Sequence, residues 1–490
     1  MNQPRLSRQL GLMGLIATGV CSMLGASINV VPFMIQRHVP GIGPYVLPAF
    51  IFAAIPALFA GLAYSMLATA MPRAGGSYIY ASRGLNPFLG FVASFSQWFG
   101  LSIVIGVVAY VTIPFLRDVA IAMSWMGLAD SLDTGMVRVG LALLLIWLFV
   151  WINIRGAKSY EKTIIPLMLL MFLMGGIVIF AGFNFSPRDF SLAILEKENI
   201  IMDILPKPDF HLPTFLSAAA LLFASFIGFD SIAQAGGEAK NPTRRLPSAI
   251  GLTILFVGSY YMIFTAAVYH AIPWSFVAEE AMRKDITAPG LLGYLLPDYL
   301  TVLIVGGAAI ALINDLPAML LSVSRLMFAW AEDGIFPKKI TKIHPKFHTP
   351  YIAIILSGLM SSIGVLGSHF AGNFFLGIDI MVTSMMVNFL LMCITLVFIR
   401  KANPLIAKEI KIIKNDSIRK LIGILGSIVL LFFLTVHTWK DIITEVGAWY
   451  FHSTPIWLIV MAIASLIFYV KLKGMKSMGI DTRSLFKKLP

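Results

Sequence analysis

Two carboxylates lie deep inside apolar stretches of this sequence, where an ionisable side chain is costly. Asp230 lies in "FASFIGFDSIAQ" (223–234), and Asp315 lies in "ALINDLPAMLLS" (311–322). A carboxylate within a bilayer costs about 2.5–3.5 kcal/mol even on the lenient insertion scale, and such residues are functional hypotheses by default. A carboxylate can exchange a proton, pair with a cation or cap a helix. The chemistry open to this chain is therefore ion and proton binding within a membrane.

The composition places these residues in an integral membrane protein. Of the 490 residues, 58% are hydrophobic and only 12% are charged, whereas soluble domains carry about 25% charged residues. The net charge of +13 comes from Lys and Arg that recur between apolar stretches, which indicates membrane topology rather than a nucleic-acid partner. Cys21 and Cys393 both lie in apolar segments, so no disulfide framework is expected. The histidines lack ligand spacing, and we expect neither a metal nor a cofactor.

Apolar segments long enough to cross a bilayer recur twelve times. A hydrocarbon core of about 30 Å needs about 20 apolar residues in a helix. The sequence therefore predicts an all-α integral membrane protein with twelve transmembrane helices. These are expected at 11–38, 46–70, 88–121, 135–154, 160–182, 213–238, 248–271, 300–328, 349–369, 372–399, 419–438 and 454–473.

The loops between these segments differ in charge. Lys and Arg are common in the loops after the even-numbered segments and in the C-terminal tail. On the other side, loops 183–212 and 272–299 carry more acidic than basic residues. Because cytoplasmic loops are enriched in Lys and Arg, we expect a multi-pass protein of the cell membrane with both termini in the cytoplasm.

Two of the predicted helices carry helix-breaking residues in their middle. The first contains "CSMLGASINVVPF" (21–33), and the sixth contains Gly228 two residues before Asp230. Close packing against a neighbouring helix could also explain the small residues of the first helix. Paired interruptions in corresponding helices are the best sequence pointer to a midplane binding site. Free N–H groups at one half-helix suit a carboxylate, and unwound carbonyls at the other suit an ammonium group. Together these groups predict a site for an amino acid.

The roles of the individual acids remain open at this stage. Asp230 either caps the second half of the sixth helix or acts as a counter-ion for a cationic substrate. Asp315 is either a proton-coupling group or a hydrogen-bonded structural residue. Glu238 is expected to pair with the basic loop that follows it, at Lys240, Arg244 and Arg245.

Several stretches, in order along residues 11–400, resemble the amino acid–polyamine–organocation superfamily. They are Met23–Pro32, "MPRAGGSYIYASRGLNPFLGF" (71–91), "FASFIGFDSIAQAGGEAKNPTRRLP" (223–247) and "SRLMFAWAEDGIFPKKITKIHPKFHTP" (324–350). The resemblance implies a LeuT-type fold with a five-plus-five inverted repeat, broken first and sixth helices and two extra helices. It implies a substrate site at Gly25, Ala26, Ser27, Ile28, Phe223, Ser225, Phe226, Ile227, Gly228 and Asp230. In LeuT-type folds the eighth span lines the sodium position, so Asp315 could serve there as the ion- or proton-coupling group.

This resemblance also implies where the chain divides. The divisions are a cytoplasmic N-terminus (1–10), a first repeat (11–182), an extracytoplasmic loop (183–212), a second repeat (213–400), helices eleven and twelve (401–474) and a cytoplasmic tail (475–490). Ala26 and Ser27 stand where the family has Ser-Gly, and Asn29 stands where it has Phe. The fifth segment (163–182) has no charged residue, whereas proton-coupled relatives often carry a lysine there.

The leading hypothesis is a secondary transporter that moves amino acids by alternating access, driven by protons or by exchange. A polyamine or cationic amino acid exchanger is the alternative, because Asp230 and Asp315 could pair with positive substrates. The sequence has no phosphate-binding loop of the G-x-x-x-x-G-K-[ST] type, which argues against an ATP-driven pump. A membrane-embedded enzyme would need paired catalytic groups in a recognisable motif, and Asp230 and Asp315 lack one. The side chain of the substrate, the direction of flux and the oligomeric state stay open.

Overall fold

The computed structural model describes residues 6–202, 206–371 and 374–489, apart from the side chains of Ala26, Ser27, Ala371, Phe374, Phe375 and Arg483. Within this part of the chain, twelve helical segments are long and apolar enough to span a membrane. They coincide with the twelve predicted segments to within a few residues at each end. The prediction of an all-α membrane protein with twelve transmembrane helices is confirmed.

Ten of the spans are each covered by one labelled helix, although α1 is interrupted within its length. They are α1 (Leu12–His38), α4 (Pro87–Ala122), α6 (Gly135–Ile154), α7 (Ala157–Asn184), α11 (Pro242–Ala271), α14 (Asp298–Glu332), α15 (Tyr351–Ala371), α16 (Phe374–Ala402), α18 (Asp416–Ile443) and α19 (Ser453–Ser477). The second span joins the short 3-10 turn η1 (Gly43–Tyr45) to α2 (Val46–Ala70). The sixth span is α9 (Leu212–Leu222), the 3-10 turn η2 (Phe223–Phe226) and α10 (Asp230–Gln234).

Local sequence explains where several spans begin. Asn86 accepts hydrogen bonds from the backbone N–H groups of Phe88 and Leu89 and so caps α4, with Pro87 as its first residue. Asn415 caps α18 in the same way, through the N–H groups of Ser417 and Ile418. Asparagine is among the best N-cap residues because its side-chain oxygen satisfies N–H groups that have no partner within the helix.

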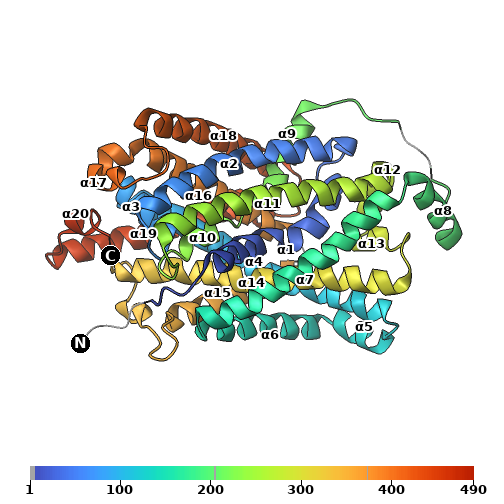
Figure 1. Ribbon diagram of the computed structural model, residues 1–490, viewed down its shortest axis with the longest axis horizontal. Helices are drawn as coiled ribbons and strands as arrows, with labels where there is room; N and C mark the ends of the chain where they lie inside the picture. Colours follow the sequence, from blue (N-terminus) through green and yellow to red (C-terminus); the bar gives the residue numbers. More distant parts are fainter. Residues whose placement is uncertain (1–5, 203–205, 372–373, 490) are drawn as a thin grey trace.

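Short helices lie between the spans and after the last span, where hydropathy alone predicts loops. The helices α5 (Met126–Asp133), α8 (Pro187–Glu198), α12 (Trp274–Arg283) and α13 (Ala288–Leu292) lie at one end of the bundle, and α3 (Gly76–Gly84), α17 (Pro404–Lys408) and α20 (Thr482–Leu485) lie at the other (Figure 1). Ser186 and Asp189 form a reciprocal capping box at the start of α8. The hydrogen bonds from Ser186 lower the pKa of Asp189.

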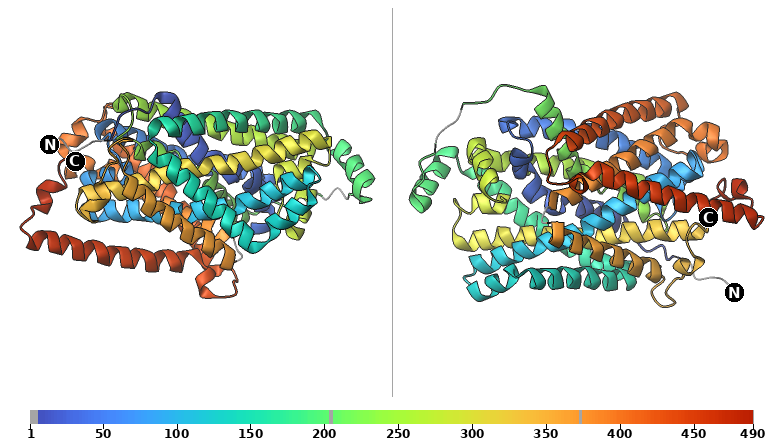
Figure 2. Two further views of the ribbon diagram at one scale, coloured as in Figure 1. Left: turned by 90° about the horizontal axis from the view of Figure 1, so that it is seen from below. Right: turned by 180° about the vertical axis from the view of Figure 1, so that it is seen from behind.

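The spans form one elongated bundle with both chain ends at the same end (Figure 1). The most apolar window of α1 is 94% buried, and those of α4, α14 and α16 are 72% buried. The corresponding window of α19 is only 17% buried, and this helix runs along the outside of the bundle (Figure 2). The two interrupted spans therefore lie among the most enclosed helices, while α18 and α19 lie at the periphery.

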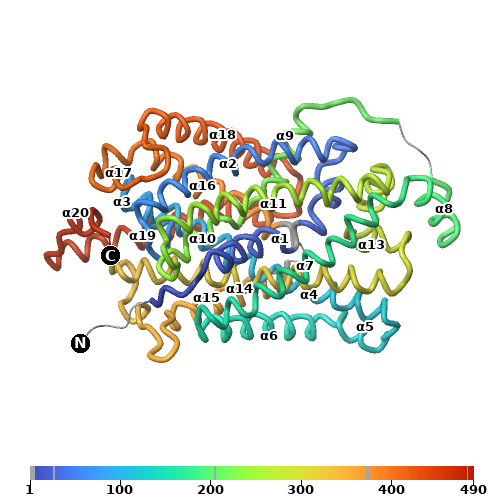
Figure 3. Tube along the Cα trace, viewed as in Figure 1, coloured from blue at the N-terminus to red at the C-terminus, as the bar shows by residue number. Residues whose placement is uncertain are grey.

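Both predicted interruptions are present. The backbone of α1 departs from helical geometry at Gly25, which has φ −41° and ψ −121°. In the sixth span the chain leaves the helix after Phe226, and Gly228 has a φ of +135°. In the tube trace, α9 lies toward the end of the bundle opposite the termini and α10 lies toward the termini (Figure 3).

Candidate functional site

The two interruptions contact each other. A Cβ atom on Gly228 would collide with the backbone carbonyl of Ser22 on α1. The hydroxyls of Ser22 and Ser231 are also hydrogen bonded at 2.9 Å, and both are buried. A glycine is needed at position 228 because its φ is positive and its Cα lies directly against backbone atoms. The broken spans are therefore joined by backbone packing as well as by one polar contact.

Asp315 lies against the interruption in α1. A Cβ atom on Gly25 would collide with the Asp315 carboxylate, and the residue is only 4% exposed. The second half of α1 begins directly after Gly25. The positive end of a helix dipole stabilises a nearby carboxylate, so α14 supplies an acid to the N-terminal end of this half-helix.

Two other side chains contact α1 beside its interruption. The hydroxyl of Tyr261 on α11 donates to the backbone carbonyl of Met23 at 2.7 Å. Asn314 on α14 donates to the sulfur of Cys21 at 2.8 Å. A carbonyl that loses its helical partner needs another donor, and Tyr261 supplies one. The break in α1 is thus stabilised from two neighbouring helices.

A cavity adjoins these groups, and we call it the central cavity. The space between atoms there is about 470 Å³, including space open to solvent, and it lies between residues of α1, α4, the sixth span, α14 and α16. Its lining residues are Ser22, Val31, Val104, Val107, Val108, Ala224, Ile227, Asp315, Met319, Ile378 and Met381. Asp315 is the charged residue of this lining, and most of the remaining wall is aliphatic.

Asp230 belongs to a buried hydrogen-bond network. Its carboxylate accepts from the side-chain amide of Gln97 on α4 and from the backbone N–H of Gly228 at 3.1 Å. It is the first residue of α10, and the residue before that helix, Phe229, makes no side-chain cap. The Asp230 carboxylate therefore accepts a backbone N–H from within the interruption, before α10 begins. This differs from a cap of the following half-helix, which was one of the two predicted roles of Asp230.

The network continues from Gln97 back to α10 and on to three further helices, α16, α2 and α3. Gln97 accepts hydrogen bonds from Gln234 of α10 at 3.2 Å and from Asn388 of α16 at 3.4 Å. Asn388 also donates to the Tyr64 hydroxyl on α2 at 2.7 Å. Tyr64 and Gln234 both bond to Ser77 on α3. Asn388 therefore joins α16 to α2 and α4 by hydrogen bonds.

Replacing Gln97 by Leu is expected to lower the free energy of unfolding by about 1–3 kcal/mol, because buried polar partners lose a hydrogen bond. Transport should fall as well, since Asp230 then keeps only one of its two contacts named above. Chemical unfolding in detergent and uptake into liposomes measure the two effects. The matched control is Gln9→Leu, because the side chain of Gln9 donates a hydrogen bond to the nearby Ser7 rather than to another helix. Equal stability of the two variants would contradict this role for the network.

Buried ion pairs close the end of the bundle that carries the termini. Arg325 on α14 contacts Glu238 at 2.6 Å, and each side chain is 2% exposed. Arg83 on α3 forms a two-pronged pair with Asp333, with the second contact at 2.7 Å. Burial opposes the charge of Arg83, but hydrogen bonding to Asp333 and its charge raise the pKa of this guanidinium. The prediction that Glu238 pairs with the basic loop after it is wrong, because a basic residue from across the bundle lies closer.

The segment before α1 also takes part in this closure. The backbone N–H of Leu10 donates to the carbonyl of Glu238 at 2.9 Å, and the N–H of Lys240 donates to the carbonyl of Leu10 at 2.9 Å. Ala74 and Ala235 form a second isolated bridge nearby. The chain around the end of α10 is therefore held by backbone hydrogen bonds from two other segments.

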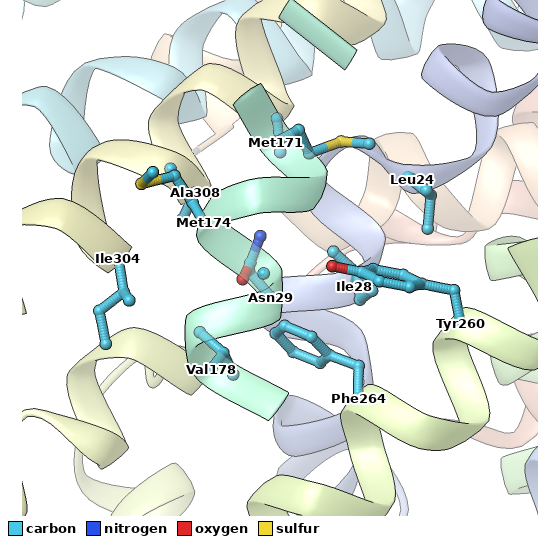
Figure 4. A pocket seen from close by; sticks show the side chains of 13 residues that line it. Leu24, Ile28, Asn29, Met171, Met174, Val178, Tyr260, Phe264, Ile304 and Ala308 are labelled. Atoms are coloured by element: carbon cyan, nitrogen blue, oxygen red, sulfur yellow. The ribbon is translucent and has the colours of Figure 1, made fainter. Parts of the chain in front are cut away.

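A second cavity, which we call the side cavity, lies between α1, α7, α11 and α14 (Figure 4). Ile28 and Asn29 line it, so Ile28 lies apart from the central cavity. The wall is mostly apolar, and Asn29 and Tyr260 supply its polar side chains. Asn29 is 6% exposed, and its amide lies between Met174, Ile28 and Val178 in the close-up (Figure 4).

The other predicted site residues divide into three groups. Phe223 and Phe226 pack against rings of neighbouring helices, such as Phe389 and Phe50, and are not among the lining residues of either cavity. Ser225 is buried beside them. Ile227 lines the central cavity. Ala26 and Ser27 were also predicted for the substrate site, and their side chains lie outside the part of the chain that is described.

Among the residues that the structure describes, no group of three His, Cys, Asp or Glu side chains is placed to hold a metal ion. Asp230 accepts hydrogen bonds from Gln97 and from the backbone of Gly228, and Asp315 lines the central cavity.

Comparison with known proteins decides the family. A family model described as amino acid permease matches residues 10–475. The chain belongs to the amino acid permease family. This permease is 26% identical to the branched-chain amino acid permease BcaP of Bacillus subtilis over 74% of its length and 75% of BcaP. It is also 26% identical to the low-affinity putrescine importer PlaP of Escherichia coli, over 78% of each chain. Cationic amino acid transporter 4 of Mus musculus is 25% identical over 73% of this chain and 55% of its own length.

Sequence reasoning missed most of the wall of the central cavity in this permease. Val104, Val107 and Val108 lie on α4, and Ile378 and Met381 lie on α16. Each is an apolar residue in an apolar span, so its type does not distinguish it from neighbours that face lipid. Gln97 could have been identified as a candidate from the sequence, because it is a polar residue within the third predicted span.

Proposed function

We propose that this permease binds its amino acid substrate in the central cavity and carries it across the membrane by alternating access. The protein is a secondary transporter of amino acids by its family and relatives. The proposal for the site is supported by the position of the cavity where both interrupted spans meet. The closed end at Arg325 and Glu238 suits one of the two states that alternating access requires.

We further propose that the closed end faces the cytoplasm of the cell that makes the protein. Both termini lie at this end (Figure 1), together with the Lys- and Arg-rich loops after α2, α9–α10 and α14. Positive loop charge favours the cytoplasmic side. Residues 11–182 and 213–400 then form two repeats of opposite orientation, each with an interrupted first helix, and the protein lies in the cell membrane.

Purified protein in liposomes tests this proposal directly. Saturable uptake of labelled amino acids, with recovery of the unchanged compound from the lumen, is the expected result. Recovery of a chemically altered product would favour a membrane-embedded enzyme. Absence of flux across a panel of proteinogenic amino acids and amines would contradict transport through the central cavity.

Asp315 is proposed as the group that couples transport to protons. Asp315→Asn keeps the shape of the side chain but removes the exchangeable proton, so uptake should lose its dependence on a pH gradient while exchange of labelled for unlabelled substrate persists. The matched control is Asp379→Asn on α16, which removes an acid from another span. Unchanged gradient dependence in Asp315→Asn would dismiss the coupling role.

A further inference from the structure

The first half of α1 is held at its N-terminal end by a residue of another span. Glu161 lies on α7, and its Oε1 atom accepts a hydrogen bond from the backbone N–H of Gly11 at 3.0 Å. Gly11 directly precedes α1 and makes no side-chain cap, and the first turn of the helix contains no acidic residue. A helix N-terminus favours a nearby carboxylate, and here α7 supplies it.

Gly14 makes room for this carboxylate. A Cβ atom at position 14 would collide with the Oε1 atom of Glu161. Gly14 lies within a regular stretch of α1, since the helical geometry of this span is lost at Gly25. Glycine is a poor residue for a helix interior, so the close approach of Glu161, and not the backbone, explains why a glycine stands here.

Two further contacts join the same pair of helices. The hydroxyl of Tyr160 on α7 donates to Thr18 Oγ1 at 3.0 Å, and the sulfur of Cys21 lies 3.9 Å from the carbonyl oxygen of Ile164. The contact with α7 therefore runs along the first half of α1, which ends at the interruption at Gly25. This half is a short helix with a break at one end and the Glu161 contact at the other.

The Glu161 end of this contact is the part that water can reach. It lies at the closed end of the bundle, near the chain termini (Figure 1). Met13 is 52% exposed, and Gly11 and Glu161 are partly exposed, whereas Thr18 and Tyr160 are buried. A separation of α1 from α7 that begins at the closed end therefore breaks the Glu161 contact first.

We propose that Glu161 positions the first half of α1 against α7 and thereby sets how often the closed end opens. The carboxylate holds α1 only while the two helices are together, so its loss favours the open state. A hydrogen bond to a charged, partly exposed acceptor changes such an equilibrium by about five- to thirtyfold. The inference rests on alternating access, as proposed above, and assigns one residue to one step of that cycle.

Gly14→Ala separates this role from the stability of the helix. The added methyl group displaces the Glu161 carboxylate, which is the end of a flexible side chain, while alanine favours the helix more than glycine does. We expect the open population to rise by about five- to thirtyfold, and the midpoint of chemical unfolding in detergent to stay the same or rise. Glu161→Ala should raise the open population equally. The double variant should raise it no further, because both changes remove one contact.

Double electron–electron resonance measures the open population in the full-length protein. Spin labels are attached to cysteines introduced at Met13 on α1 and Leu169 on α7, which are both exposed. The native cysteines, Cys21 and Cys393, are buried. A longer separation of the labels reports the open state. Gly251→Ala on α11 is the control and should leave the separation unchanged, because a Cβ atom there would have no described atom within 4 Å.

A further variant tests whether the carboxylate acts only as a cap of α1. Gly11→Asp places an acid at the N-cap of the helix itself, and a Cβ atom at Gly11 would lie 4.0 Å from the Oε1 atom of Glu161, which is an ordinary contact. Combined with Glu161→Ala, it caps α1 without joining it to α7, so the open population should stay raised. Return of this population to that of the unmodified protein would overturn the positioning role.

The outcomes separate this inference from the proposed function. An open population that is unchanged in both Gly14→Ala and Glu161→Ala overturns the role of Glu161, and saturable uptake by the unmodified protein then leaves the proposed function standing. An equal rise in Gly251→Ala also overturns that role. A single label separation in every variant, with and without substrate, together with absence of uptake, counts against alternating access itself.

Discussion

Gly228→Ala is expected to abolish transport. The added Cβ would meet the backbone carbonyl of Ser22, and neither backbone can yield without separating the two interrupted spans. The φ of +135° at this position adds strain for any residue with a side chain. Overpacking and strain are each worth about 1–3 kcal/mol, so the free energy of unfolding should fall together with the rate of uptake.

The matched control for this variant is Gly258→Ala on α11. A Cβ atom there would lie 3.5 Å from the Phe226 ring, which is an ordinary van der Waals contact. Uptake and the midpoint of chemical unfolding in detergent should stay close to those of the unmodified protein. If Gly228→Ala transports as well as Gly258→Ala, close contact between the interruptions is not required for function. The collision with backbone predicts a loss of stability as well as a loss of transport.

Glu238→Ala is expected to destabilise the protein by about 3–5 kcal/mol, because it leaves the Arg325 guanidinium buried without its carboxylate. Both side chains are 2% exposed, so water cannot replace the missing partner. The change should also loosen the end of the bundle near Leu10, whose backbone bonds to residue 238. Chemical unfolding in detergent measures the first effect, and proteolysis near the N-terminus measures the second.

An exposed ion pair provides the control for the buried one. Glu279 and Arg283 on α12 contact each other at 2.5 Å with exposed fractions of 62% and 60%, and such pairs contribute about 0–1 kcal/mol. Glu279→Ala should therefore have little effect. The double variant Glu238→Met with Arg325→Met should recover most of the lost stability, since well-packed apolar residues can replace a buried pair. A single Glu238→Ala that unfolds like Glu279→Ala would show that the buried pair is not needed for stability.

The number of spans and the two interruptions could be predicted because each depends on a local property of the sequence. A run of about twenty apolar residues crosses a bilayer as a helix. A glycine within such a run, such as Gly228, marks a position where the backbone can leave the helix. The predicted partner of Glu238 was wrong because ion pairing depends on which helices pack together, and not on a local property of the sequence. Lys240 is near in sequence, but Arg325 is 87 residues away, and packing of α14 against α10 brings it closer.

The contact between Asp315 and Gly25 could not be predicted from the spacing of residues in the sequence either. Each residue was singled out, one as an acid in a span and the other as a helix breaker. Their proximity follows from the packing of α1 against α14, which no pattern within either helix reveals. The same limit applies to Gln97 and Asp230, whose contact joins α4 to α10.

Cys21 gives this protein a built-in reporter of its conformation. Its thiol lies four residues before Gly25 and is 1% exposed, against Asn314 on α14. The other cysteine, Cys393 on α16, is fully buried, so the two together give a low background of labelling. If the closed end opens by parting α1 from α14, as the proposed alternating access requires of one end, water would reach Cys21. The rate at which a small thiol reagent modifies the unaltered protein, with and without substrate, would then follow the transport cycle without an engineered probe.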